Sequence, residues 1–174
     1  FLVGAADQDG SLCCNPYLII DSDEGILIDP GSPLDFEAVF ANVTGLIPLE
    51  KIKYVVLHHQ DPDFCASVPL FEQKGLQAQI VTHWRTSVIT KYYGIKSAYY
   101  IVDQHDFKLV LASGRTFLFV PTPYLHFPGA IATYDLYSKT LFSSDLFGAF
   151  SSSNWGLYAP DNYVEAMKAF HEHY

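Results

Sequence analysis

The sequence predicts an α+β fold in which two packed β-sheets lie between outer helices, an αββα sandwich. Over residues 17–102, short apolar runs typical of strands alternate with segments whose apolar residues have helical spacing. From residue 108 onward the chain consists mainly of strand-like runs joined by polar turns. A chain of 174 residues with 49% hydrophobic residues is enough for one core, so we expect residues 1–174 to form a single domain.

The first half should interleave strands and helices. Strands are predicted at residues 17–20, 25–28, 54–57, 79–81 and 98–102. Ser32 can cap a helix that has Pro33 at its first position, because that position needs no N–H, and this helix should run through Phe40. Further helices are predicted at residues 65–73 and 83–93.

The second half should be mostly β. Strands are predicted at residues 108–111, 116–120, 130–135 and 140–142, and a final helix should start near Asp161. That helix reaches the end of the sequence without a C-terminal capping signal, and Phe1 is not an initiator methionine. We therefore expect a fragment of a longer chain, truncated at its C-terminus.

Composition excludes several functional classes. The 10 basic and 19 acidic residues give a formal net charge of -9 without a basic cluster, which argues against binding to nucleic acid or to an anionic membrane. No apolar run approaches the roughly 18 residues that a membrane-spanning helix needs. Three cysteines, Cys13, Cys14 and Cys65, are a poor disulfide framework, and no signal peptide is visible, so we predict a cytoplasmic protein.

The most informative segment is the apolar run at residues 54–57, which ends in a cluster of imidazoles and carboxylates. His59, Asp61 and Asp63 alternate along the chain directly after this predicted strand. Nitrogen and oxygen ligands crowded together are what a hard or borderline metal ion needs. Without a cation, each of two buried neighbouring carboxylates would raise the other's pKa. Taken alone, the segment is also compatible with a solvated turn.

Two later strands end in further candidate ligands. His126 follows the predicted strand at residues 116–120, and Asp145 follows the strand at residues 140–142. Individually, His126 could be an ordinary loop histidine and Asp145 a turn residue or helix cap. Together with His59, Asp61 and Asp63, they form a constellation that predicts a metal site.

The order of strands and ligands resembles the metallo-β-lactamase superfamily and, within it, the diiron domain of the flavodiiron proteins. Those proteins carry His-x-Glu-x-Asp-His after a strand, then His-Trp-Pro-Asp, then Leu-Phe-Ser-x-Asp-x-Phe-Gly. Residues 59–63 match the first motif with Asp61 in place of Glu, residues 126–128 match the second, and residues 141–148 match the third. Residues 15–20 resemble the first strand of that family. The resemblance covers nearly the whole chain. No flavodoxin-like pattern occurs in these 174 residues.

The resemblance implies an iron-binding site. His59, Asp61 and His126 would bind one iron, Asp145 would bridge to a second iron, and Asp63 would bind that second iron. Imidazole and carboxylate ligands suit iron, whereas thiolate-rich sites suit zinc or clusters.

Three positions depart from the family pattern. Phe64 replaces the last histidine of the first motif, and the family's final histidine ligand lies beyond Tyr174. The second iron would then keep only Asp63 and Asp145, unless His58, His83 or a later residue substitutes. Gly129 replaces the aspartate of the second motif, which removes a hydrogen bond expected behind the ligands.

Four functions are consistent with these residues. The first is a non-haem diiron domain that binds dioxygen as a sensor or carrier, which a fused signalling domain in the full-length chain would favour. The second is a flavodiiron-type oxidoreductase that reduces dioxygen or nitric oxide with an external electron donor. The third is a zinc-dependent hydrolase, although Asp61 and Phe64 break the His-x-His-x-Asp-His motif typical of such enzymes. The fourth is a metal-free structural relative. A homodimer is a further option.

Overall fold

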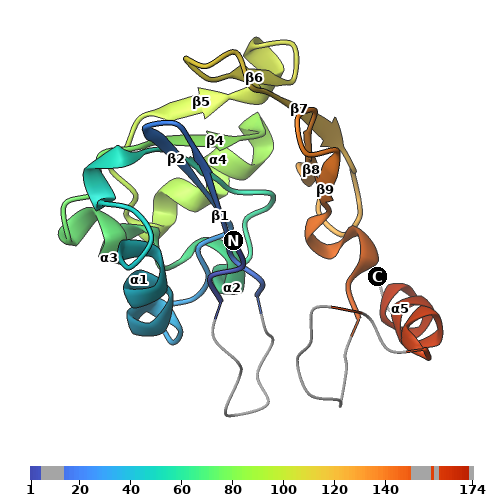
Figure 1. Cartoon of the computed structure of the whole chain (residues 1–174). Helices are drawn as coiled ribbons and strands as arrows, with labels where there is room; N and C mark the ends of the chain where they lie inside the picture. The colour runs from blue at the N-terminus through green and yellow to red at the C-terminus, as the bar shows by residue number, and fades with distance from the viewer. Residues whose placement is uncertain (5–13, 150–157, 159–160, 173–174) are drawn as a thin grey trace.

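The computed structural model describes residues 1–4, 14–149, 158 and 161–172, which contain two β-sheets (Figure 1). The first sheet has five strands in sequence order: β1 (Tyr17–Asp21), β2 (Glu24–Ile28), β3 (Ile52–Val56), β4 (Gln79–Thr82) and β5 (Tyr99–Ile101). The first two strands form an antiparallel hairpin, and β2 to β5 pair in parallel. The carboxyl ends of β2, β3 and β4 therefore meet at one edge of the sheet.

The second sheet is an antiparallel meander of four strands, β6 (Lys108–Val110), β7 (Thr116–Pro121), β8 (Ile131–Asp135) and β9 (Thr140–Phe142). Each strand pairs with the next along the chain. Short 3₁₀ turns connect several elements: η1 (Leu49–Lys51), η2 (Lys91–Tyr93), η3 (Val102–Gln104) and η4 (Ser144–Phe147).

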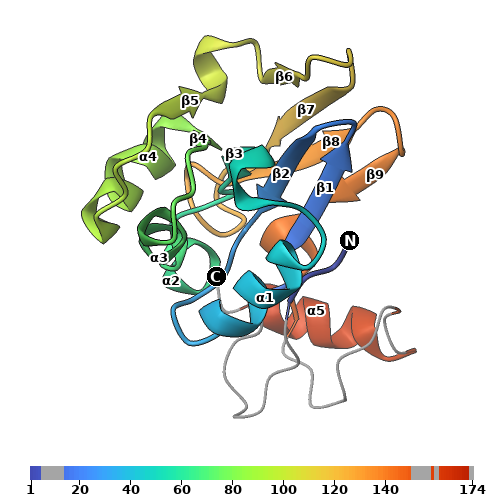
Figure 2. The ribbon, with the colours of Figure 1, turned by 60° about the vertical axis from the view of Figure 1, so that its left-hand side comes forward.

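Within the described ranges, five helices accompany the sheets: α1 (Phe36–Thr44), α2 (Pro62–Cys65), α3 (Val68–Gln73), α4 (Trp84–Thr90) and α5 (Tyr163–His171). Figure 2 shows α1 to α4 beside the first sheet and α5 below the second sheet. Two cores separate these layers. One contains residues of α1 and α3, such as Val39 and Phe71, packed against Leu18 and Leu27 of the first sheet.

The second core lies between the two sheets. Ile19 and Val56 of the first sheet meet Phe117, Phe119 and Ile131 of the second. Neighbouring residues of one strand enter different cores, as Leu18 and Ile19 of β1 do, because side chains alternate between the faces of a sheet. Both faces of the first sheet are thus buried, which explains its continuous apolar strands.

The αββα sandwich predicted from the sequence is confirmed, and the elements differ from the prediction only locally. The helix expected at residues 65–73 is two helices, α2 and α3, and Pro69 lies in the first turn of α3. Proline lacks an N–H and would clash with the preceding turn, so a helix cannot continue through it but can begin there. The helix expected at residues 83–93 tightens into η2 after Thr90 and ends at Gly94, which has a φ of 88°.

The first predicted helix starts later than expected. Ser32 Oγ donates to Asp35 and accepts from the backbone N–H of Leu34, so it closes a turn, and α1 begins at Phe36. Cys14 and Cys65 are buried free thiols, whereas Cys13 lies outside the described residues. None of the helices in the described ranges is long and apolar enough to cross a membrane.

Replacing Leu27 by alanine should lower the free energy of unfolding by about 2–5 kcal/mol, because a fully buried leucine leaves a cavity. Leu27 is 0% exposed, and Leu34, which is 88% exposed, offers a matched control. Leu34→Ala should change stability by no more than about 0.5 kcal/mol. Urea denaturation of both variants measures the difference, and equal effects would contradict the position of the core.

Candidate metal centre

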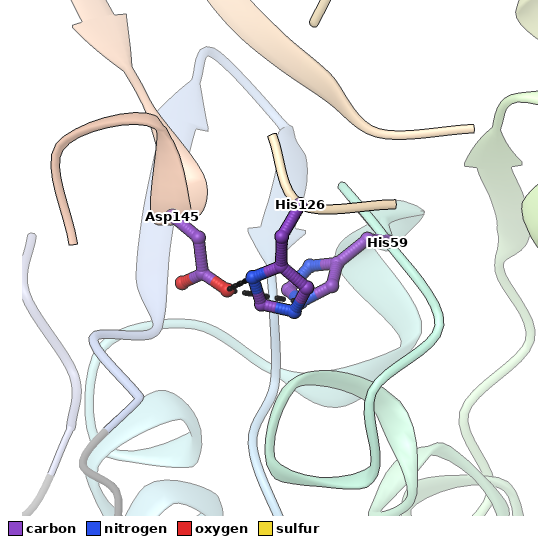
Figure 3. A group of neighbouring side chains, drawn as sticks. All are labelled: His59, His126 and Asp145. Atoms are coloured by element: carbon purple, nitrogen blue, oxygen red, sulfur yellow. Dashed lines mark ion pairs between the residues drawn. The ribbon is translucent and has the colours of Figure 1, made fainter. Parts of the chain in front are cut away.

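Three segments that are distant in sequence bring their side chains together at one end of the sheets. His59 follows β3, His126 lies in the loop between β7 and β8, and Asp145 lies in η4 after β9. One nitrogen or oxygen atom from each of these residues lies within 4.8 Å of the others, close enough to hold a single metal ion. Figure 3 shows both imidazoles and the carboxylate pointing toward one another.

A backbone hydrogen bond joins the two sheets beside this cluster. The N–H of Ile131, at the start of β8, donates to the carbonyl of His58 at 3.0 Å. His58 directly precedes His59, and Ile131 follows the loop that carries His126. This contact therefore holds the two histidine-bearing segments, which belong to different sheets, at a fixed separation.

Asp61 completes a closed arrangement of two imidazoles and two carboxylates, here called the His–Asp ring (His59, Asp61, His126 and Asp145). Asp61 Oδ2 lies 2.8 Å from His126 Nε2 and 3.5 Å from His59 Nε2. Asp145 Oδ2 lies 3.1 Å from His59 Nε2 and 3.5 Å from His126 Nδ1. Each imidazole thus lies near both carboxylates, His59 through Nε2 alone and His126 through both ring nitrogens.

The backbone around Asp61 follows from the proline after it. Asp61 has φ -65° and ψ 144°, the extended conformation that a residue before proline prefers. Pro62 then begins α2 at a position where its missing N–H costs nothing. This abrupt change from extended chain to helix places the Asp61 carboxylate beside the histidines.

The ring shifts the pKa values of its members in opposite directions. Burial alone would lower the pKa of His59, but the adjacent Asp145 and Asp61 carboxylates raise it to about 10. The contact with His59 lowers the pKa of Asp61 to about 2, although burial opposes the change. In the metal-free protein, His59 therefore carries a proton, and this positive charge offsets the carboxylates around it.

Asp63, predicted as a ligand, lies apart from the His–Asp ring. It is half-buried on α2, and within the described residues no ion pair of 4.0 Å or less joins its carboxylate to a histidine. Burial raises the pKa of Asp63 above its ordinary value. The next residue, Phe64, is buried with its ring 4.2 Å from that of His59, so an apolar group occupies this side of His59.

The two substitute ligands considered from the sequence, His58 and His83, are both engaged elsewhere. His58 Nδ1 lies 2.5 Å from Asp29 Oδ2, and its Nε2 lies 2.8 Å from Thr133 Oγ1. His83 Nε2 lies 3.0 Å from Asp103 Oδ1, and its Nδ1 accepts from the N–H of Arg85. Neither histidine belongs to the group of three ligand atoms.

The sequence analysis does not predict the contact between Asp29 and His58. Asp29 also accepts the His58 backbone N–H through Oδ1 at 2.9 Å, and Asp29, His58 and Thr133 are all buried. Asp29 is the first residue after β2, and His58 is the second residue after β3. These two strands are parallel neighbours in the sheet. That parallel pairing was the signal that could have predicted the contact.

Steric crowding explains why glycine occupies position 129 in place of the family's aspartate. A Cβ atom at this position would lie 2.8 Å from Arg85 Cβ and 3.0 Å from Thr86 Oγ1. Thr86 Oγ1 also donates to the Gly129 carbonyl at 3.0 Å. The loop that carries His126 therefore packs directly on α4, and an aspartate here would need that packing to open.

A family model described as "ODP family beta lactamase" matches residues 12–174. The chain belongs to this family. An uncharacterized protein of Methanocaldococcus jannaschii is 28% identical over 80% of the chain, and the anaerobic nitric oxide reductase flavorubredoxin of Pectobacterium carotovorum is 26% identical over 77% of it. The chain covers 35% and 27% of the lengths of these two relatives, respectively.

Solved structures of diiron proteins share the fold. A structure of the chemotaxis sensor ODP with a peroxy diiron species matches with a TM-score of 0.79 and 25% sequence identity. The match covers 98% of this ODP-family chain and 69% of the sensor chain. The flavodiiron protein from Giardia intestinalis has a TM-score of 0.76 and 30% identity, over 90% of this chain and 39% of its own. The predicted relationship to flavodiiron cores is confirmed.

In the absence of metal, the free energy of unfolding should fall as the pH rises from 6.5, the ordinary pKa of histidine, toward 10, the folded-state pKa of His59. The folded chain keeps a proton that the unfolded chain releases, so this contribution is complete below pH 6.5 and is lost progressively above it. Urea unfolding in EDTA up to about pH 8, where thiols and tyrosines stay mostly protonated, measures the slope. His59→Gln should remove it, and an unchanged slope in that variant would contradict the charged state of His59.

Proposed function

We propose that this chain is a non-haem diiron domain that binds dioxygen as a sensor or carrier. The observation that carries the proposal is the His–Asp ring, in which donor atoms from three strand ends converge on one point. The family match supports it, because a solved ODP chemotaxis sensor of the same fold contains a diiron species. The alternative of a metal-free structural relative leaves the convergence of these donors unexplained.

The donor set suits iron. Its nitrogen and oxygen donors are those of non-haem iron sites, and the nearby Cys65 thiol is directed to the carbonyls of Gln60 and Asp61 instead. His59 Nε2 is buried and makes no hydrogen bond of good geometry within the described part of the chain, although the Asp145 carboxylate lies nearby. A buried nitrogen between two carboxylates fits a metal ligand better than a structural histidine.

The two iron positions differ in the ligands that the chain offers. We assign His59, Asp61 and His126 to the first iron, Asp145 to the bridge and Asp63 to the second iron. The first position has its donors already assembled, whereas Asp63 stands outside the ring and Phe64 lies where a family histidine would be. We therefore expect the first position to fill at lower iron concentration than the second.

Iron bound in such a site supplies open coordination positions at which dioxygen or nitric oxide can bind. The residues of the chain hold and shield it. Asp61 and Asp145 offset its charge, and Phe64 packs against His59 on an apolar side. Phe170 of α5 is buried, with its ring 6.3 Å from His126, which limits the access of water from that direction.

The names of some relatives favour a second candidate function. A flavorubredoxin with nitric oxide reductase activity and a coenzyme F420H₂ oxidase both match three quarters or more of this chain. Repeated reduction of dioxygen or nitric oxide would need an electron donor outside residues 1–174. A zinc hydrolase is less favoured, because Asp61 and Phe64 stand where such enzymes carry histidines. The single-domain organisation, the cytoplasmic location and a homodimer stay predictions.

Asp145→Ala should abolish the binding of an iron pair and any absorption band that appears when air is admitted, because the bridging carboxylate is lost. Anaerobic metal analysis followed by absorption spectroscopy measures both effects. Asp23→Ala removes an exposed carboxylate far from the ring and should change neither. An Asp145→Ala variant with wild-type iron content and spectrum would contradict the bridge, and one zinc per wild-type chain would favour the hydrolase.

Phe64→His should raise the iron content toward two per chain and tighten the second position, because an imidazole replaces an apolar ring beside His59. Phe64→Leu controls for the change in packing without adding a ligand and should leave the iron content unchanged. Iron titration under anaerobic conditions compares the three proteins. Equal stoichiometry in all of them would show that Phe64 does not limit the second position.

A further inference from the structure

Helix α4 has the reverse of the usual distribution of side chains. Its buried residues are the threonines Thr86 and Thr90, which are 0% exposed. On its outer side and in η2, large apolar or aromatic residues face solvent: Trp84 is 47% exposed, Val88 42%, Ile89 40% and Tyr92 81%. A surface helix normally turns its apolar side toward the core. Packing of the core therefore does not explain why the large apolar residues of α4 face solvent.

The inward threonines are hydrogen-bonded, so the reversed orientation is stable. Thr86 Oγ1 donates to the Gly129 carbonyl, and Thr90 Oγ1 lies 3.1 Å from Tyr99 Oη. Trp84 and Val88 are four residues apart and share one side of α4, next to Ile89, and Tyr92 follows four residues later in η2. We call this surface the α4 face (Trp84, Arg85, Val88, Ile89, Lys91 and Tyr92). A contiguous exposed apolar surface of this kind marks an interaction site.

The α4 face is also basic within an acidic protein. Both charged side chains of the α4 face, Arg85 and Lys91, are basic, although the chain carries a net charge of -9. One carboxylate borders the face, that of Asp103, which accepts from the N–H of Trp84 at 3.0 Å. The Arg85 guanidinium lies 4.8 Å from the Trp84 ring and the Lys91 ammonium 5.6 Å from the Tyr92 ring. Among the described residues, no carboxylate lies within 4.0 Å of either cation.

We propose that the α4 face docks an acidic protein segment that also carries apolar side chains, such as an acidic amphipathic helix. Apolar side chains of the partner would cover Trp84, Val88 and Tyr92, and its carboxylates would pair with Arg85 and Lys91. A symmetric contact between two copies of this chain would place those cations against each other, which disfavours a second copy as the occupant.

The docking surface adjoins the proposed metal centre. The start of α4 packs on Gly129, three residues after His126, and the Thr86 hydrogen bond joins the helix to that loop. A partner on the α4 face would therefore contact the element that supports one side of the His–Asp ring. Only this link between the docked partner and a metal centre rests on the proposed function; the docking itself does not.

The test is calorimetric titration of the metal-free chain with two synthetic helical peptides. Both carry leucine at helical spacing, and the remaining positions are glutamate in one peptide and lysine in the other. The glutamate peptide should bind at least about tenfold more tightly than the lysine peptide, and this preference should shrink in high salt. In a Trp155→Phe background, binding should also shift the emission of Trp84 to shorter wavelength.

Variants place the binding on the α4 face. Tyr92→Ser and the double variant Arg85→Glu, Lys91→Glu should each weaken binding of the glutamate peptide at least about tenfold. Tyr137→Ser is the matched control, because Tyr137 is 79% exposed with the Arg115 guanidinium 5.0 Å from its ring, yet lies in the turn between β8 and β9. Circular dichroism checks that each variant is folded.

Three outcomes would overturn the inference: equal binding of the two peptides, equal losses in Tyr92→Ser and Tyr137→Ser, or self-association in sedimentation that Tyr92→Ser abolishes. The last result would make a second copy the occupant. The assay needs no metal, so its failure is separate from that of the proposed function. A chain that binds the glutamate peptide but no iron would support docking and contradict the diiron assignment. A chain that binds iron but not the peptide would support the diiron assignment and contradict docking.

Discussion

The junction at His58 is the constraint on which the candidate site depends. Its carbonyl accepts the N–H of Ile131 from the second sheet, while its ring lies between Asp29 after β2 and Thr133 in β8. These contacts are buried, where an unpaired polar group would cost about 1–3 kcal/mol, so their geometry is strongly specified. One residue thus sets the distance between the sheets at the point where His59 must meet His126 and Asp145.

Electrostatics explains why the His–Asp ring is stable without metal and still suited to a cation. Two carboxylates of the ring lie close enough together that a positive charge between them is favourable. In the metal-free chain the proton on His59 supplies part of that charge, as its pKa of about 10 indicates. A metal ion would have to displace this proton, so iron binding and proton release are linked in this site.

Much of the arrangement could be predicted from the sequence, for identifiable reasons. Apolar runs at β3, β7 and β9 each end in a candidate ligand, and His59, His126 and Asp145 do converge. The separation of Asp63 from the ring could not be predicted, because it depends on the turn of α2 after Pro62. The roles of Asp29 and Gly129 depend on contacts with residues distant in sequence, β3 for Asp29 and α4 for Gly129, which local patterns do not contain.

The ligands of the ring come from both halves of the chain, His59 and Asp61 from the first and His126 and Asp145 from the second. The sheets also meet through the apolar core between them and through an ion pair between Arg115 and Asp21, whose Nη1 and Oδ1 atoms are 3.4 Å apart. A cation held by His59, His126 and Asp145 would act as a cross-link between the layers and would bind only when both are folded. Metal loading would then merge the two sheets into a single cooperative unit, with slower amide hydrogen exchange in β7 and β8.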